Sequence, residues 1–159
     1  MRIVIQRVTQ ASVSVDGDCI GQIKKGLLLL VGFEATDNSE DLEWMARKTL
    51  QLRIFDDSDG VMNRSLEDLS VEATNEHDKP GILVISQFTL HASTKKGNRP
   101  SYIRAAPPAI AIPLYESFVQ QIRESWSGII ETGRFGAEMQ VSLINDGPVT
   151  ICIDSKNKE

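Results

Sequence analysis

The chain has 159 residues, of which 41% are hydrophobic, and it carries a formal net charge of -5. This length allows one domain with its own core, without disulfides or a structural metal. The negative charge excludes a protein that binds nucleic acid over its whole surface. A local basic patch is still expected, because no acidic residue occurs between Asp78 and Glu116. The basic residues of that window are Lys79, Lys95, Lys96, Arg99 and Arg104.

No targeting or membrane segment is expected. Residues 1–7 interrupt their apolar run with charged side chains and lack a small-residue cleavage site. The longest apolar run, residues 27–31, is too short to span a membrane. Cys19 and Cys152 lie in apolar, strand-like contexts without metal-type spacing, which indicates buried thiols in a reducing compartment. We therefore expect a cytoplasmic protein with no membrane association.

The start of the chain predicts antiparallel strands. Residues 2–8 and 11–15 are rich in Ile and Val and partly alternate, which predicts two strands, and residues 19–24 predict a third. Residues 27–33 are apolar on both faces, which indicates a central strand.

A helix is predicted after residues 37–39, which offer an N-cap. Its apolar residues at helical spacing are Leu42, Met45, Ala46 and Leu50. A short strand over residues 52–55 is expected next.

The second half predicts a strand over 82–90, a polar and basic loop over 93–101, and a helix opened by Pro107 and Pro108. A hairpin of residues 139–144 with 149–154 follows. The apolar stripe of that second helix predicts a face in the core. Its members are Leu114, Phe118, Ile122 and Trp126.

Together these elements indicate an α/β fold, with a mainly antiparallel, barrel-like sheet and two main helices. No composition break marks a second domain. We expect a single domain over residues 1–155 and a charged, frayed tail at 156–159.

Metal and cofactor sites are not predicted. The two histidines, His77 and His91, belong to no HxH, HExxH or Cys/His cluster, so zinc is not expected. Residues 56–60 are similar to the start of a calcium loop, but the EF-hand register would need Phe55 and Leu66 as ligands. No P-loop or GxGxxG occurs, so no nucleotide cofactor is expected.

Nucleophilic catalysis by a side chain has little support. On a regular strand Ser86 and His91 would lie on opposite faces, which argues against a Ser-His pair. Thr89 would share a face with Gln87 and His91, so a Thr-His pair stays open beside the more common hydrogen-bonded strand end. The residues alone indicate a pocket for a polar ligand and name no reaction.

The polar segment 145–150 interrupts an apolar strand-like run. Asp146, Gly147 and Pro148 favour a tight turn, and from base rates alone only about 5% of bonds before proline are cis.

Four motifs together resemble the D-aminoacyl-tRNA deacylases, formerly called D-Tyr-tRNA deacylases. They occupy residues 86–90, 96–101, 132–137 and 145–150, and the opening residues 2–8 are similar as well. The resemblance covers residues 1 to about 155. It implies an α/β homodimer with active sites at the subunit interface. It also implies hydrolysis of D-aminoacyl-tRNA, and of glycine mischarged on tRNA-Ala, without a cofactor.

The resemblance also assigns roles to individual residues. Ser86, Gln87, Phe88 and Thr89 are expected to line the catalytic pocket, which holds the terminal adenosine and the ester. The family's account of the chemistry uses the 2′-hydroxyl of the terminal ribose, with backbone N–H groups near Phe88 and Thr89 as oxyanion donors. An older alternative makes Thr89 a nucleophile.

Substrate binding is expected from Gly147, Pro148, Val149 and Thr150. The resemblance implies a cis Gly147–Pro148 bond inserted into the partner subunit's pocket, where two parallel carbonyls accept hydrogen bonds from the substrate ammonium. An L side chain would then meet main chain, whereas a D side chain would point away. Arg7 is expected to brace this unit; the alternative is an ordinary strand-surface arginine.

Lys95, Lys96 and Arg99 are expected to contact the tRNA backbone, although a solvated loop is the simple alternative. Two other functions also stay open. One is an RNA-end binding module without catalysis, and the other is a Ser/Thr esterase acting on small esters.

Overall fold

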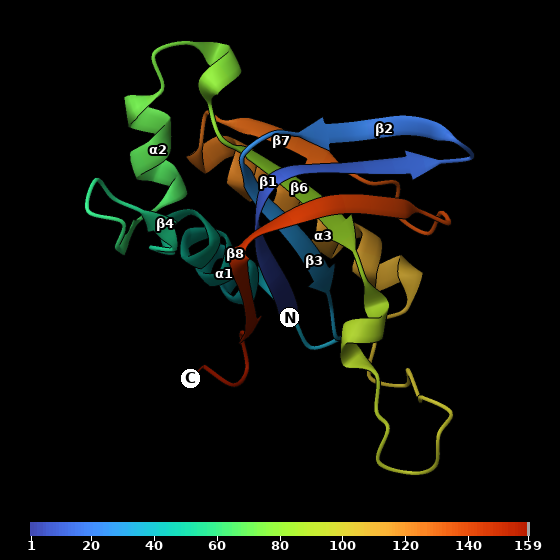
Figure 1. The fold of residues 1–159 in the computed structure, drawn as a ribbon. Helices are drawn as coiled ribbons and strands as arrows, with labels where there is room; N and C mark the ends of the chain where they lie inside the picture. The colour runs from blue at the N-terminus through green and yellow to red at the C-terminus, as the bar shows by residue number, and fades with distance from the viewer. Residues whose placement is uncertain (159) are drawn as a thin grey trace.

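The fold is described by a computed structural model covering residues 1–158, apart from the side chain of His77 (Figure 1). The strands are β1 (Arg2–Val15), β2 (Asp18–Ile23), β3 (Gly26–Gly32), β4 (Phe55–Asp56), β5 (Met62–Arg64), β6 (Gly81–Ser86), β7 (Ile129–Thr132) and β8 (Gln140–Asp154). The helices are α1 (Ser39–Gln51), α2 (Leu66–Glu72) and α3 (Pro108–Ser125), with the 3₁₀ helices η1 (Glu76–Asp78) and η2 (Phe88–His91).

The main sheet confirms the predicted barrel-like α/β architecture. Its strand order is β2-β1-β3-β6-β7, and β8 also pairs with β1. All pairings of β1 are antiparallel, whereas β3–β6 and β6–β7 are parallel. The sheet curls until β2 meets β7, so that a Cβ atom at Gly21 would lie 3.1 Å from the carbonyl oxygen of Thr132. The barrel is thus nearly closed by packing rather than by a further ladder.

Two strand predictions at the ends of the chain were wrong. Residues 2–8 and 11–15 form one strand, β1, and residues 139–144 and 149–154 do not form a hairpin with each other. Both halves of β8 pair instead with β1. Each strand therefore continues past its polar residues, because the segments on both sides of those residues pair with the same partner strand.

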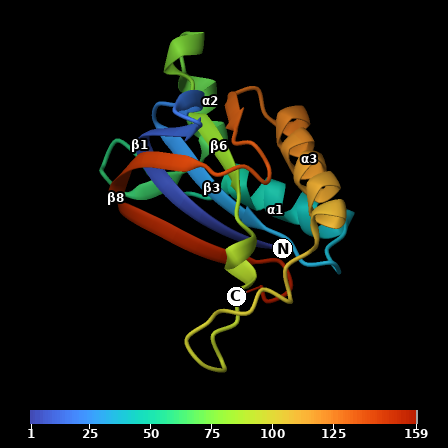
Figure 2. The same ribbon diagram turned by 90° about the vertical axis from the view of Figure 1, so that its right-hand side faces the viewer.

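The core confirms the central strand and the two main helices. β3 lies between β1 and β6 and is buried along most of its length. Helices α1 and α3 pack together over one side of the sheet (Figure 2). Asn38 caps α1, since its side chain accepts from the N–H groups of Glu40 and Asp41. Phe118, Ile122 and Trp126 of the α3 stripe are buried.

Helix α2 was not predicted, and the strand expected over residues 52–55 is reduced to β4. Leu52 ends α1, and only Phe55 and Asp56 are paired, with β5. A signal for α2 existed in the sequence, because Ser65 and Asp68 form a capping box at its start.

The prediction of buried thiols was wrong. Cys19 and Cys152 are both exposed free cysteines. Each belongs to a strand with one outward face, β2 or β8, and side chains alternate between faces along such strands.

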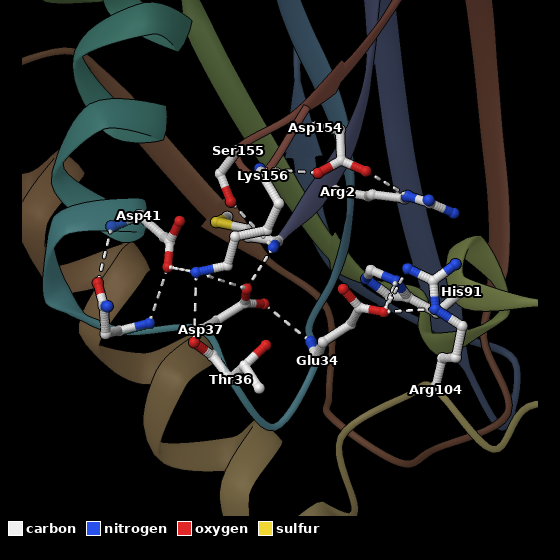
Figure 3. A network of polar contacts seen from close by, with 12 residues as sticks. Arg2, Glu34, Thr36, Asp37, Asp41, His91, Arg104, Asp154, Ser155 and Lys156 are labelled. Carbon is white, nitrogen blue, oxygen red and sulfur yellow. Dashed lines mark hydrogen bonds and ion pairs between the residues drawn. The ribbon is translucent and has the colours of Figure 1, made fainter. Parts of the chain in front are cut away.

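The C-terminal segment is anchored at least to Lys156. The α-amino group of Met1 lies 2.5 Å from Asp37 and 3.0 Å from the Ser155 hydroxyl, and Lys156 lies 2.5 Å from Asp41 (Figure 3). Burial would raise the pKa of Asp41, but the hydrogen bonds from Lys156 and Ser155 outweigh it and lower the pKa. Glu159 of the predicted tail lies outside the described residues, and the domain boundary itself stays a prediction.

Candidate active site

A pocket of about 580 Å³ opens where the parallel strands β3 and β6 end. Carboxyl ends of parallel strands are a frequent place for ligand sites. The lining residues come from β3 and the residue after it, from β6 and η2, from the start of α3 and the segment before it, and from the β7–β8 connection and the start of β8. Among the described residues that line it, none is acidic, basic or a histidine.

The predicted strand over 82–90 stops at Ser86 and turns into η2. The Gln87 N–H donates to the Val31 carbonyl at 2.7 Å, and the chain then coils into a 3₁₀ helix. This turn brings Ser86, Gln87 and Phe88 into the pocket lining. Thr89 is not part of the lining, and its hydroxyl accepts a 2.6 Å hydrogen bond from the Gln87 side chain.

An aromatic pair forms the rim of the pocket. The ring of Phe88 meets the ring of Tyr102 edge-on, with centroids 5.1 Å apart. Both side chains are largely exposed although large aromatic residues favour burial. The rim therefore presents apolar surface to whatever enters the pocket.

The Thr-His pair left open by the sequence is wrong. His91 is buried, and its Nδ1 faces the Glu34 carboxylate at 3.5 Å rather than Thr89. Burial lowers the pKa of His91, against a smaller opposing effect of the Gly32 backbone and of Glu34. Among the described side chains, Thr89 therefore has no histidine to activate it.

The Gly147–Pro148 bond is cis, as the resemblance implied and contrary to the base-rate expectation. The segment is held from within, because the Asn145 side chain accepts from the Val149 N–H at 3.2 Å and donates to Thr150 at 3.0 Å. Gly147 has φ +116°, a conformation that favours glycine.

Arg7 is buried directly beneath this turn and is not a strand-surface arginine. Its guanidinium donates to the carbonyls of Ile54 at 2.6 Å and Asp146 at 3.3 Å. The carboxylates of Asp56 and Asp146 lie 3.3 and 3.2 Å away. A buried guanidinium is stable only when its charge and its N–H groups are paired. Because its partners come from the turn and from residues 54 and 56, Arg7 connects the turn to β4.

One chain does not bring the two predicted groups together. Arg7 pairs with Leu27 at the start of β3, whereas Ser86 pairs with Val31. Four residues of strand separate these positions by roughly 13 Å. Residues 147–150 are absent from the pocket lining.

The basic loop begins and ends at the pocket. Ser93 and Ser101 close it with two backbone hydrogen bonds of 2.8 and 2.9 Å, and Tyr102 follows at the rim. Lys95, Lys96 and Arg99 are exposed at its far end, which projects away from the sheet in Figures 1 and 2.

Most of the pocket residues, three large side chains among them, were not singled out from the sequence. Tyr102, Phe135 and Met139 contribute large side chains to the lining. Tyr102 follows the basic loop and Phe135 lies in the motif 132–137, so their motifs were noted without a role. For Met139 the sequence indicated only that it begins a strand, and nothing in it predicted a place in the pocket.

The sequence model of the family described as D-Tyr-tRNA(Tyr) deacylase matches residues 4–154. The chain belongs to this family. The resemblance seen in the four motifs is thereby confirmed, and membership makes the chain an enzyme, a deacylase that hydrolyses an ester.

Relatives extend over the whole chain. A D-aminoacyl-tRNA deacylase of Bacteroides fragilis (strain YCH46) is 58% identical over 159 residues, with 100% of both chains covered. One of Flavobacterium psychrophilum is 57% identical over the same length and coverage. A solved structure described as c-Myc DNA Unwinding Element Binding Protein is 41% identical, with a TM-score of 0.87, covering 97% of this chain and 98% of that one.

No helix among the described residues has the length and apolar character needed to cross a membrane.

Gly147→Ala is expected to lower deacylation of a D-aminoacyl-tRNA at least about tenfold, because an added Cβ would lie 2.9 Å from Val149 Cγ2 and 3.0 Å from Arg7 Nη2. Gly17→Ala is the matched control. Gly17 also has positive φ, but a Cβ there meets nothing within 4 Å. Gly17→Ala should lose about 1 kcal/mol of stability in urea unfolding from backbone strain alone, and Gly147→Ala should lose more because its Cβ also meets Val149 and Arg7, so activities are compared where both variants are folded. Equal activity of the two would contradict the role given to the turn.

Proposed function

We propose that this chain hydrolyses the ester bond of D-aminoacyl-tRNA, releases the free D-amino acid and tRNA, and leaves L-aminoacyl esters intact. The site is assembled in a homodimer, and the enzyme acts in the cytoplasm as a proofreading step of translation. The observation that carries the proposal is the combination of a pocket whose described lining holds no acid or base with a firmly held Gly147–Pro148 turn.

The pocket supports catalysis by positioning. Its described lining residues include no charged side chain and no histidine, so none of them is suited to take a proton from water. The first N–H groups of a helix lack intrahelical acceptors, and within residues 1–158 those of Phe88 and Thr89 donate to no other residue. They are suited to stabilise an oxyanion, while the 2′-hydroxyl of the terminal ribose assists the attack. An aminoacyl ester is labile enough for this to suffice.

The turn supplies the chiral test. In the proposed dimer, Gly147 and Pro148 of one subunit enter the pocket of the other, and their carbonyl oxygens accept hydrogen bonds from the substrate ammonium. With the α-carbon fixed against main chain, an L side chain collides and a D side chain points outward. Glycine has no side chain to reject, so glycyl-tRNA mischarged on tRNA-Ala is also a substrate.

A dimer is supported by the separation of the two groups. Arg7, which holds the turn, pairs with Leu27, whereas Ser86 pairs with Val31, and these positions lie roughly 13 Å apart along β3. A two-fold symmetric pair would give two equivalent sites, each with a pocket from one subunit and a turn from the other.

The basic loop is the proposed contact with the tRNA backbone. Lys95, Lys96 and Arg99 are exposed, and none of them forms a hydrogen bond or ion pair with the described residues. Because the loop starts and ends at the pocket rim, these cations lie where the acceptor end would leave the pocket.

The first experiment compares release of amino acid from matched D-Tyr-tRNA and L-Tyr-tRNA, with chelator present and protein substoichiometric. We expect rapid loss of the D ester and an intact L ester. Survival of both esters together with tRNA binding would favour an RNA-end binding module without catalysis. Hydrolysis of small activated esters without action on tRNA would favour an ordinary esterase.

Mixed dimers test the shared site. We expect Gly147→Ala and Gln87→Ala proteins to be weak separately, because the first lacks a correct turn and the second a correct pocket. Co-expressed with different tags, they should regain about a quarter of wild-type activity, since half of the dimers then hold one intact site of two. Activity equal to the mean of the two separate proteins would contradict insertion into the partner.

Thr89→Ala separates positioning from nucleophilic catalysis. Only the hydrogen bond from Gln87 is lost, so the rate should fall about two- to tenfold. If Thr89 were the nucleophile, turnover would be abolished. Single-turnover rates on D-Tyr-tRNA distinguish these outcomes.

Neutralising Lys95, Lys96 and Arg99 to Gln together should weaken tRNA binding and make its dependence on salt less steep. Three lost phosphate contacts would lower the slope of log K against log salt by roughly two to three. The control neutralises the exposed Lys24, Arg47 and Arg123, which lie away from the loop. An unchanged slope in the loop variant would favour a simple solvated loop.

A further inference from the structure

Three segments of the candidate active site meet at one carboxylate outside the pocket. Glu34 directly follows Phe33, the last pocket residue contributed by the β3 segment. Its Oε1 atom accepts a 2.8 Å hydrogen bond from Arg104 Nε and lies 2.7 Å from Arg104 Nη2. The same atom faces His91 Nδ1 at 3.5 Å (Figure 3).

Each partner of Glu34 belongs to another segment of the pocket. His91 ends η2, the helix that begins with Phe88. Arg104 lies between Tyr102 and Ala105, which both line the pocket after the basic loop. One oxygen atom therefore binds Arg104 at the base of the basic loop and lies beside His91 at the end of η2.

Glu34 is itself firmly held. Its N–H donates to Asp37 Oδ2 at 2.8 Å, and the Asp37 N–H returns a bond to the Glu34 carbonyl at 3.1 Å. Asp37 is buried on the α-amino group of Met1. Beside this, the Ala106 N–H donates to the Phe33 carbonyl at 2.8 Å, which places the loop base against β3.

The Glu34–Arg104 ion pair has a role besides stabilising the fold. The side chain of Arg104 is 52% exposed and that of Glu34 is 14% exposed, so water screens the pair from one side and its contribution to stability is modest, about 1 kcal/mol. The pair nevertheless fixes the residue two positions after Tyr102, whose ring meets Phe88 at the rim. Its main effect is thus on where the rim and the loop lie.

We propose that Glu34 is a positioning residue, which holds the rim and the basic loop in register with η2 through its bonds to Arg104 and its contact with His91. The expected kinetic effect rests on the proposed function, whereas the effect on the position of the rim and the loop does not. Rim and loop contact the RNA rather than the ester, so loss of Glu34 affects binding of the tRNA end more than the chemical step.

The kinetic test uses Glu34→Gln, Arg104→Gln and the double variant on D-Tyr-tRNA. We expect KM to rise about tenfold in each single variant, the equivalent of one lost charge-assisted contact, with kcat within about twofold. The double variant should be no worse than either single one, because both remove the same contact. Glu76→Gln is the control, since it breaks the exposed pair with Lys79 away from the pocket.

Three results would overturn the proposal. They are an unchanged KM in Glu34→Gln, additive effects in the double variant, and a loss of kcat that follows a lowered Tm. The last pattern would indicate a structural role alone.

Amide hydrogen exchange decides the question independently of catalysis. In Glu34→Gln, the amides of Ala92, Ala105 and Ala106 should exchange faster at unchanged global stability, because they close η2 and the loop base. Unchanged exchange overturns the inference. If the wild-type protein leaves the D ester intact, the proposed function fails, and this exchange measurement still tests Glu34.

Discussion

The pairing of β1 with β8 is the constraint on which the rest of the structure depends. The two strands pair from Arg2–Asp154 to Ser14–Gln140, with a shift of register on each side of Val8, and the larger interruption lies opposite Arg7. There residues 146–149 have no pairing partner, because Val8 pairs with Asn145 and Gln6 with Thr150. With both flanks fixed, the additional residues have to leave the plane of the sheet. The protruding Gly147–Pro148 turn is the result.

Burial of Arg7 makes this protrusion rigid. A guanidinium inside the protein is tolerated only when its charge and donors are satisfied, and here one main-chain carbonyl comes from the distant residue Ile54. The turn thus depends on the segment after α1 as well as on its own strand. Its residues are also absent from the lining of the pocket in the same chain, so the proposed enzyme is complete only when two chains combine the rigid turn of one with the pocket of the other.

Charge and apolar surface are separated in the proposed site. The pocket lining that the structure describes is uncharged, whereas the exposed cations lie on the loop outside it. An overall charge of -5 is compatible with RNA binding because the acid-free window concentrates positive charge on that loop. Glu34 lies between the two regions and binds Arg104 at the foot of the loop, so the base of the loop and the edge of the pocket are physically connected.

The sequence by itself determined the elements that depend on local order. The sequence predicted the Asn38 cap of α1, the strand β3 that is apolar on both faces, and the apolar stripe of α3. Caps and periodicities depend on residues only a few positions apart. Only the tertiary structure decided whether β1 and β8 are continuous, since that depends on a partner from the other end of the chain. It also ended β6 at Ser86, through a hydrogen bond to Val31, and thereby turned His91 into the core. The motifs predicted where in the sequence the site residues lie. The pocket lining combines segments that are distant in the sequence, so no local pattern could predict which of them come together.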